Sequence, residues 1–258
     1  MPTKRNTTRE IKIKNKKSRK GDKCEFFAKL SAKESGKSRM KTLIIDYGMG
    51  NLHSVKNAFD FIGEDAYISS DISEMEKADA LLLPGVGAFP DASDMLYKSG
   101  IADKIIELCG KGDKPLLGIC LGMQLLLDES DEVRLSKGLG LVSGRCEKIA
   151  DTGLKIPHMG WNDLVLDDKS CPLFTDTKDG DYVYFVHSFK AALDDKKNLL
   201  AHTFYGEEIP AVIGNGKNVF GCQFHPEKSE AIGLGILKSF CEFARGRLNA
   251  ECGMRSAE

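Results

Sequence analysis

The stretch Lys114-Pro115-Leu116-Leu117-Gly118-Ile119-Cys120-Leu121-Gly122-Met123-Gln124 carries the clearest structural signal in this chain. The apolar run before Cys120 predicts a buried parallel strand, and residues 121–127 predict a helix. Glycines on both sides of Cys120 permit the tight strand-to-helix turn that holds a nucleophile at the carboxyl edge of a sheet. The positive end of the following helix would favour the thiolate. The same glycine spacing is equally typical of a buried structural cysteine, so the interpretation depends on the rest of the chain.

The part of the chain before this stretch alternates strands with helices. Apolar runs predict strands at residues 42–46, 66–69 and 80–83. Residues 52–62 predict a helix with Asn51 as its N-cap, and residues 90–110 predict one or two more. This alternation predicts right-handed βαβ units, a mostly parallel sheet, and a ligand site at the carboxyl edge of its strands.

The second half of the chain predicts a different arrangement. Short β-prone segments lie at residues 144–149, 164–166, 182–189, 199–204, 211–213 and 219–224. The closing helix carries an apolar stripe of Ile232, Ile236, Leu237, Phe240 and Phe243, and we expect fraying beyond Arg247. The predicted fold class is α/β, with a mostly parallel central sheet flanked by helices and additional antiparallel strands in the second half.

Charge divides the chain into two unlike parts. Residues 1–39 hold 14 Lys or Arg against 4 Asp or Glu, whereas the remainder holds 23 basic and 34 acidic residues. The basic segment has too little apolar content to offset the entropy cost of ordering it. We therefore expect residues 1–39 to be a disordered extension, with Met40 as the natural start, and residues 40–258 to form one domain. A transit peptide is the alternative interpretation of the extension.

Composition argues against several classes of partner. The basic segment lacks the aromatic interleaving and the recognisable fold that would support nucleic-acid binding. No run approaches the roughly 18 apolar residues that a membrane span requires, so we expect no membrane association. The eight cysteines are scattered singly, without a C-x-x-C pair or a Cys/His spacing suited to zinc. Without a signal peptide, we expect reduced thiols, a cytoplasmic location and neither a metal nor an organic cofactor.

A thiolate nucleophile needs a base, and the base needs a group that orients it. His225 and Glu227 lie two residues apart at the end of a predicted strand, so both side chains can project to one side. Glu227 could then accept a hydrogen bond from one imidazole nitrogen while the other addresses Cys120. Alone, a His-Pro-Glu sequence is more often a turn, but its combination with the cysteine turn favours a catalytic triad.

The stretch Pro84-Gly85-Val86-Gly87-Ala88-Phe89 follows the third predicted strand. Two glycines directly after a buried strand let backbone N–H groups turn toward a ligand, as an oxyanion hole requires. Taken alone, the stretch is equally typical of an ordinary turn.

These residues also carry a family resemblance. Gly118-Ile-Cys120-Leu-Gly122-Met-Gln124 together with Gln223-Phe-His225-Pro-Glu227 resembles the triad of the class I glutamine amidotransferases, whose fold is flavodoxin-like. A finer resemblance, to the glutaminase subunits of imidazole glycerol phosphate synthases, rests on four further segments: Asp46-Tyr-Gly-Met-Gly-Asn51-Leu-His53-Ser54-Val55, Pro84 to Phe89, Pro157-His-Met-Gly-Trp161-Asn162 and Tyr184-Phe-Val-His187-Ser188-Phe189. It covers about residues 40–247, and Phe189 stands where tyrosine often occurs in the family.

The resemblance implies a role for each matching residue. Cys120 would attack the side-chain amide of L-glutamine, His225 would act as base and then acid, and Glu227 would orient His225. Backbone N–H groups near Val86, Gly87 and Leu121 would stabilise the oxyanion. Gln124, Ser188 and Phe189 would hold the substrate.

The resemblance also implies a partner. In the family, ammonia passes into a (β/α)₈ cyclase that makes imidazole glycerol phosphate and an aminoimidazole carboxamide ribonucleotide in histidine biosynthesis. This chain has no length left for that barrel, so we expect the cyclase to be a separate polypeptide and the complex to be a heterodimer. The expected docking surface includes Asn51, Pro157, Trp161 and Asn162, although Trp161 could equally be a core anchor.

Two alternatives remain open from the sequence. The chain could be a class I glutaminase that serves another synthase, such as anthranilate, aminodeoxychorismate or pyridoxal phosphate synthase. The Pro157 to Asn162 segment argues against this. The chain could also be a non-enzymatic regulatory protein on the same fold, although an intact set of Cys120, His225 and Glu227 argues against that.

Overall fold

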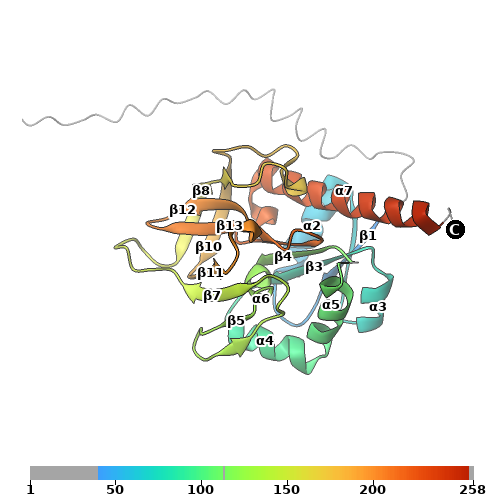
Figure 1. Ribbon diagram of the computed structural model, residues 1–258, viewed down its shortest axis with the longest axis horizontal. Helices are drawn as coiled ribbons and strands as arrows, with labels where there is room; N and C mark the ends of the chain where they lie inside the picture. Colours follow the sequence, from blue (N-terminus) through green and yellow to red (C-terminus); the bar gives the residue numbers. More distant parts are fainter. Residues whose placement is uncertain (1–39, 113, 256–258) are drawn as a thin grey trace, which may run out of the picture.

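The computed structural model describes residues 40–112 and 114–255, and side chains up to residue 250. The predicted basic extension, residues 1–39, lies outside the described residues. The described part is built around an eight-stranded sheet of order β2-β1-β3-β4-β14-β13-β12-β9 (Figure 1). Strands β2 to β14 in this order pair in parallel, and the last three pair antiparallel. This confirms the predicted fold class.

The first half of the chain supplies the parallel strands and most of the helices. Its elements are β1 (Lys41–Ile45), α2 (Leu52–Ile62), β2 (Asp65–Ser69), α3 (Ile72–Lys77), β3 (Ala80–Gly85), α4 (Phe89–Lys98), α5 (Ile101–Gly110), β4 (Leu116–Cys120) and α6 (Leu121–Leu125). Asn51 caps α2 as predicted, because its side-chain oxygen accepts from the backbone N–H of Ser54 at 3.3 Å. Residues 90–110 form two helices, separated at Gly100, whose φ is +77°.

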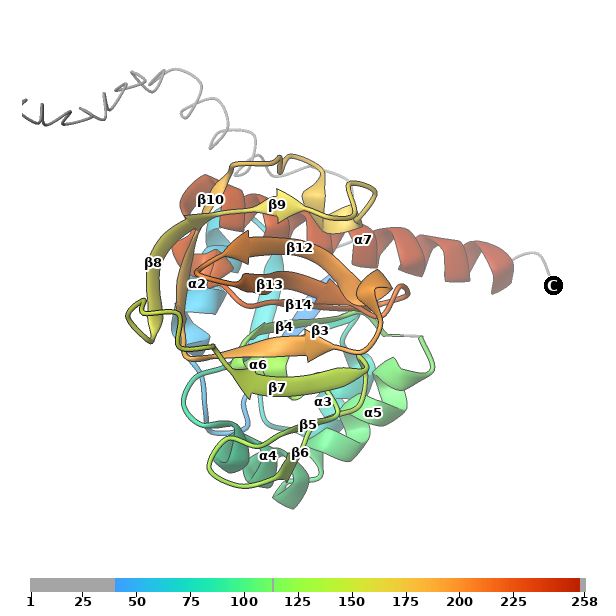
Figure 2. The ribbon, with the colours of Figure 1, turned by 60° about the vertical axis from the view of Figure 1, so that its left-hand side comes forward.

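The second half is mainly antiparallel. Its strands are β5 (Glu129–Ser130), β6 (Ser136–Lys137), β7 (Gly144–Lys148), β8 (His158–Asp163), β9 (Val165–Leu166), β10 (Tyr182–His187), β11 (Phe189–Leu193), β12 (Leu199–Phe204), β13 (Glu208–Gly214) and β14 (Val219–Cys222). Its helices are the 3₁₀ turns η1 (Pro172–Phe174), η2 (Lys196–Asn198) and η3 (Pro226–Lys228), and α7 (Glu230–Arg255). Besides the main sheet, β8 pairs with β10, and β11-β7-β5-β6 form a four-stranded sheet (Figure 2).

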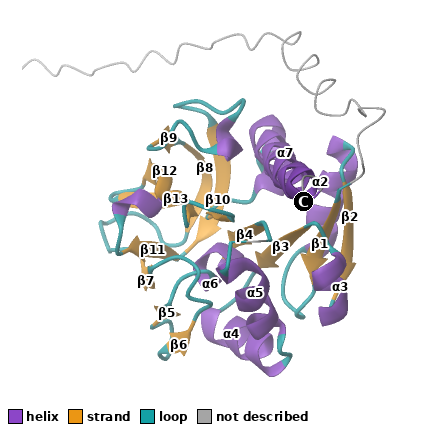
Figure 3. Ribbon diagram, turned by 45° about the vertical axis from the view of Figure 1, so that its right-hand side comes forward, coloured by secondary structure: helices purple, strands orange, loops and turns teal. Residues whose placement is uncertain are grey.

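Alternate side chains of the parallel strands enter two separate cores. Ile44 and Leu82 pack with α2 and α7 on one face, whereas Leu43 and Leu81 pack with α4 and α5 on the other. Figure 3 shows the helices in these two layers. Because both faces are covered, the central strands β3 and β4 are buried along their whole length, as is typical of a parallel sheet.

Three predicted elements differ in the structure. Residues 182–189 do not form one strand, because β10 ends at His187 and pairs with β8, while β11 begins at Phe189 and pairs with β7. A β-prone run cannot reveal that its two halves have different partners. Helix α6 ends at Leu125, before the predicted residue 127. Helix α7 continues to Arg255 instead of fraying after Arg247.

Candidate active site

Cys120 lies at a strained turn between β4 and α6. Its φ of +55° and ψ of −108° are unusual for a residue with a side chain. The flanking glycines are required for close approach: an added β-carbon at Gly122 would lie 1.8 Å from the carbonyl oxygen of Leu83, and one at Gly118 would lie 2.6 Å from that of Gly122. The turn therefore holds the thiol at the carboxyl edge of the sheet. Because α6 is short, its dipole is weaker than the sequence led us to expect.

His225 reaches the same edge by following the neighbouring strand. Strand β14 pairs with β4 in parallel, with Cys222 opposite Ile119. The backbone N–H of His225 donates to the carbonyl of Tyr184 at 2.9 Å, and Nδ1 lies 2.9 Å from Oε1 of the buried Glu227. The expected strand-end geometry was wrong: β14 ends at Cys222, and the 3₁₀ turn η3 brings His225 and Glu227 together.

The partners of His225 decide its charge. Burial lowers the pKa of an imidazole, but interactions with Cys120 and Glu227 outweigh it here and raise the pKa of His225 to about 9. An imidazole with this pKa carries a proton near neutral pH. His225 is therefore suited to stabilise a thiolate first and to donate a proton afterwards.

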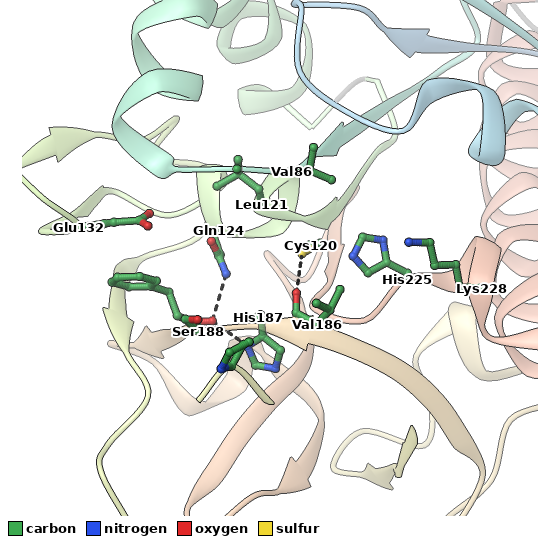
Figure 4. A pocket seen from close by; sticks show the side chains of 13 residues that line it. Val86, Cys120, Leu121, Gln124, Glu132, Val186, His187, Ser188, His225 and Lys228 are labelled. Atoms are coloured by element: carbon green, nitrogen blue, oxygen red, sulfur yellow. Dashed lines mark hydrogen bonds between the residues drawn. The ribbon is translucent and has the colours of Figure 1, made fainter. Parts of the chain in front are cut away.

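Cys120 and His225 line a pocket of about 460 Å³, within the range of small-molecule sites. The other predicted residues that line it are Val86, Gly87, Leu121, Gln124, Pro157, Ser188 and Phe189. Glu227 lies behind His225. Trp161 and Asn162 are not among the lining residues, and neither is Asn51. Figure 4 shows Gln124, Val186 and His225 around the thiol.

Gln124 is held by the protein rather than left free. Its Nε2 donates to the carbonyl of Phe189 at 3.0 Å and to Oε1 of Gln223 at 3.1 Å. Nε2 of Gln223 in turn lies 3.8 Å from the sulfur of Cys120. Gln124 therefore sets the position of the Ser188–Phe189 wall, in addition to lining the pocket.

The loop after β3 faces the thiol. Gly85 lies opposite Cys120 in the β3–β4 register, and Gly87 has a φ of +99°. Glu132, from the loop between β5 and β6, accepts from the backbone N–H of Phe89 at 2.8 Å and so anchors the far end of this loop. The side chain of Val86 is 43% exposed, which leaves the middle of the loop uncovered.

Four pocket residues were missed by sequence reasoning: Glu132, Val186, His187 and Lys228. Lys228 follows Glu227 directly, so its proximity could have been noticed. Glu132 had no such signal, because its loop reaches the site only through the pairing of β5 with β7. The residues expected to dock a partner lie outside the core: Trp161 is 47% exposed and therefore is not a core anchor.

The described residues contain neither a metal-binding cluster nor a helix suited to span a membrane. No three His, Cys, Asp or Glu side chains in residues 40–112 and 114–250 lie close enough together to hold a metal ion. None of the described helices is both long and apolar enough to cross a membrane.

Comparisons with known proteins agree with this fold. Residues 43–241 match the family described as glutamine amidotransferase class-I. A PurLQS structure from Thermotoga maritima aligns with a TM-score of 0.64 at 20% identity, over 80% of this chain and 99% of its own. The crystal structure of a glutamine amidotransferase from Thermotoga maritima aligns with a TM-score of 0.58 at 14% identity, over 81% and 99%. These likenesses show the fold, and the family match shows that the chain belongs to the class I glutamine amidotransferases.

Curated relatives indicate which members of the family this chain closely resembles in sequence. The imidazole glycerol phosphate synthase subunit HisH of Geobacillus sp. (strain WCH70) is 50% identical over 209 residues, which cover 79% of this chain and 97% of the relative. HisH of Caldanaerobacter subterraneus subsp. tengcongensis is 52% identical over 202 residues, which cover 78% and 98%. Within the class, the chain groups with these HisH subunits.

Proposed function

We propose that this chain hydrolyses L-glutamine at Cys120 and supplies the ammonia to a separate cyclase subunit of imidazole glycerol phosphate synthase. The observation that carries the proposal is the meeting of three features at one sheet edge. A strained turn presents Cys120, the side chain of the buried Glu227 lies 2.9 Å from Nδ1 of His225, and a pocket of about 460 Å³ opens onto Cys120 and His225.

The chemistry follows from the order of these groups. The thiolate of Cys120 attacks the amide carbon, and the electron pair of the carbonyl moves onto its oxygen. Protonated His225 gives its proton to the nitrogen, which leaves as ammonia when the tetrahedral intermediate collapses to a glutamyl thioester. Neutral His225 then takes a proton from water, which attacks the thioester. Glutamate and a proton leave, and the thiolate of Cys120 and the protonated His225 are restored.

The developing oxyanion needs donors close to Cys120. The backbone N–H of Leu121 begins helix α6 beside the thiol, and the peptides of Val86 and Gly87 line the same pocket. Loss of one such donor costs roughly 10²–10³ in rate. Because Gly87 lacks a β-carbon, its peptide can rotate at low cost. Docking of the partner would then control activity by turning this loop into its productive orientation.

The pocket offers complementary groups for the rest of a glutamine molecule. Glu132 is the acidic side chain of the lining and would pair with the substrate ammonium group, while Lys228 would attract its carboxylate. Ser188 and Phe189 form the wall that Gln124 holds. These contacts would align the amide with Cys120.

The face of β8 and β10 is the proposed docking surface. Its exposed apolar side chains are Met159 at 61%, Trp161 at 47% and Tyr182 at 57%. Trp161 packs edge-on against Tyr184, with ring centroids 6.0 Å apart, so its orientation is set before docking. Pro157 connects this face to the pocket. Exposed aromatic residues of this kind are enriched at interfaces. The free cysteines among the described residues support a reducing, cytoplasmic setting.

The test is glutamate formation from glutamine by the chain with the cyclase subunit of the same synthase, with and without the ribonucleotide substrate of the cyclase. We expect Cys120→Ala to abolish glutamate formation and to leave the melting temperature and partner binding nearly unchanged, because the side chain is small. Glutamine turnover near the wild-type rate in this variant would refute the assignment. Equal kcat for the chain alone, with the empty cyclase and with the loaded cyclase would refute only the control by docking.

A further inference from the structure

Two buried histidines lie beside the pocket and have no role in the proposed chemistry. His158 on β8 and His187 at the end of β10 are directly opposite each other in the antiparallel pairing. They are 3% and 6% exposed, and Nδ1 of His158 lies 3.0 Å from Nε2 of His187. Burial of two imidazoles in contact calls for a complete set of hydrogen-bond partners.

The neighbouring groups permit one arrangement of protons. The carbonyl oxygen of Phe189, 2.8 Å from Nδ1 of His187, can only accept, so that nitrogen carries the hydrogen. Nε2 of His187 is then a bare acceptor and receives the Nδ1 hydrogen of His158. Nε2 of His158 receives a hydrogen in turn from Nδ2 of Asn162 at 3.3 Å, and the same amide donates to the carbonyl of Phe204 at 3.1 Å.

Both rings are held neutral. Burial lowers the pKa of His158 to about 4 and that of His187 to about 3. The ring of His158 stacks between Phe185 and Tyr205, with centroids 4.7 Å and 4.1 Å away. An added proton would set two N–H groups against each other across 3.0 Å. The hydrogen bonds therefore run in one direction, from Asn162 inward to Phe189.

The inner end of this series is the wall of the glutamine pocket. The carbonyl of Phe189 accepts from His187 and also from Gln124, so two donors fix its position. Figure 4 shows His187 and Gln124 on the two sides of the Ser188 segment, with both bonds drawn. Ser188 joins β10 to β11, and its carbonyl accepts from the backbone N–H of Ile149 at 3.0 Å. The two bonds to the neighbouring carbonyl of Phe189 add to this backbone bond in placing Ser188 in the pocket.

The outer end lies on β8 directly beside its exposed residue Trp161. Half-buried Asn162 directly follows Trp161, and its side chain points inward to His158 rather than outward. An apolar side chain in place of His158 could also pack between Phe185 and Tyr205, so packing alone does not explain a polar ring there. The hydrogen bonds of the polar rings fix the direction of donation, from β8 toward the pocket wall, and the distance between these two parts.

We propose that Asn162, His158 and His187 are positioning residues, and that their hydrogen-bond relay sets the Ser188–Phe189 wall for substrate binding. The proposal rests on the proposed function of the pocket, and it adds to it a connection between the outer face of β8 and the affinity for glutamine. None of the three residues touches the reacting atoms. Their effect is on binding and therefore on KM more than on kcat.

The kinetic test uses the complex with the cyclase. His187→Leu removes the donor to Phe189, and we expect KM for glutamine to rise about three- to tenfold, the range that loss of one neutral hydrogen bond gives. His187→Asn keeps a donor near the Nδ1 position and should restore much of the affinity. The matched control is Phe59→Leu, which loses packing in the same core from helix α2, outside the relay. Equal KM in His187→Leu and in a control of equal melting temperature would refute the proposal.

Two further measurements address the relay itself. Asn162→Ala should raise KM less than His187→Leu, and the double variant should be no worse than His187→Leu alone, because the two changes break one series. Additive effects would refute the relay.

Independently of activity, ¹⁵N spectra of the histidines should show His158 and His187 neutral with hydrogen on Nδ1. Hydrogen on Nε2 in either ring would refute the relay, whereas absence of wild-type glutaminase activity would refute the proposed function.

Discussion

Two buried histidine sites flank the nucleophile, and they are held in opposite states. His225 is 4% exposed and His187 is 6% exposed, so burial does not distinguish them. His225 faces the carboxylate of Glu227 and the thiol of Cys120, and its pKa is raised to about 9. His187 faces a carbonyl and a neutral imidazole, and its pKa is lowered to about 3. The difference teaches that the partner, not the depth, decides whether a buried imidazole can carry a proton.

The largest expected effect is that of replacing His225, the histidine with the raised pKa. His225→Ala removes the proposed acid and base, and we expect kcat to fall by about 10²–10⁴, the usual contribution of general acid–base catalysis. The measurement is glutamate formation by the saturated complex with the cyclase. If His187→Leu lowered kcat as much as His225→Ala does, the proposed division of roles would be wrong.

Glu227→Gln changes the partner of His225 and should have a smaller effect on the rate. The amide still accepts a hydrogen bond from Nδ1 of His225, but it no longer offers a negative charge to the imidazolium. The pKa of His225 should fall, and kcat should fall by less than in His225→Ala, because histidine keeps part of its function without its orienting group. The pH profile of kcat is the measurement. A profile and rate identical to the wild type would show that Glu227 is not the cause of the raised pKa.

The smallest expected effect is on stability, and it has opposite signs at the two sites. Between pH 6.5 and about 9, the native protein binds a proton at His225 that the unfolded chain has lost, so the contribution of His225 to stability falls as pH rises. Below pH 6.5, the unfolded chain protonates His158 and His187 while the native protein does not, so stability falls as pH decreases.

Melting temperatures from about pH 5.5 to about pH 9 can separate the two contributions. His225→Gln should flatten the alkaline side of the curve, and His187→Leu should flatten the acid side. The surface variant His202→Gln is the matched control, since His202 pairs with Asp167 away from the pocket. If either site variant flattened both sides alike, the contrast between the sites would not hold.

Local signals in the sequence predicted the elements that depend on their own residues. Asn51 caps α2, and the glycines around Cys120 permit its turn, because these effects act over a few residues. The pairing of strands was harder to predict from the sequence. The strand β8 was not predicted, and β10 and β11 were merged, because their identity depends on partners far along the chain.

The same distinction applies to the site. Cys120 and the His225-Pro226-Glu227 turn could be found from short patterns, since the chemistry needs those residue types in that order. Glu132 could not be found, because only the pairing of β5 with β7 brings it to the pocket, whereas His187 directly precedes Ser188 and its proximity could have been noticed.

By itself, the sequence determined which reactive groups the chain carries and which local turns present them, because glycine spacing, helix caps and apolar runs act between neighbouring residues. Only the tertiary structure decided the state of those groups. The charge of His225 depends on Glu227 and Cys120, and the neutrality of His187 depends on His158 and the carbonyl of Phe189. These partners meet after strands distant in sequence have paired, and a pKa responds to the few groups within hydrogen-bond distance and to the exclusion of water around them.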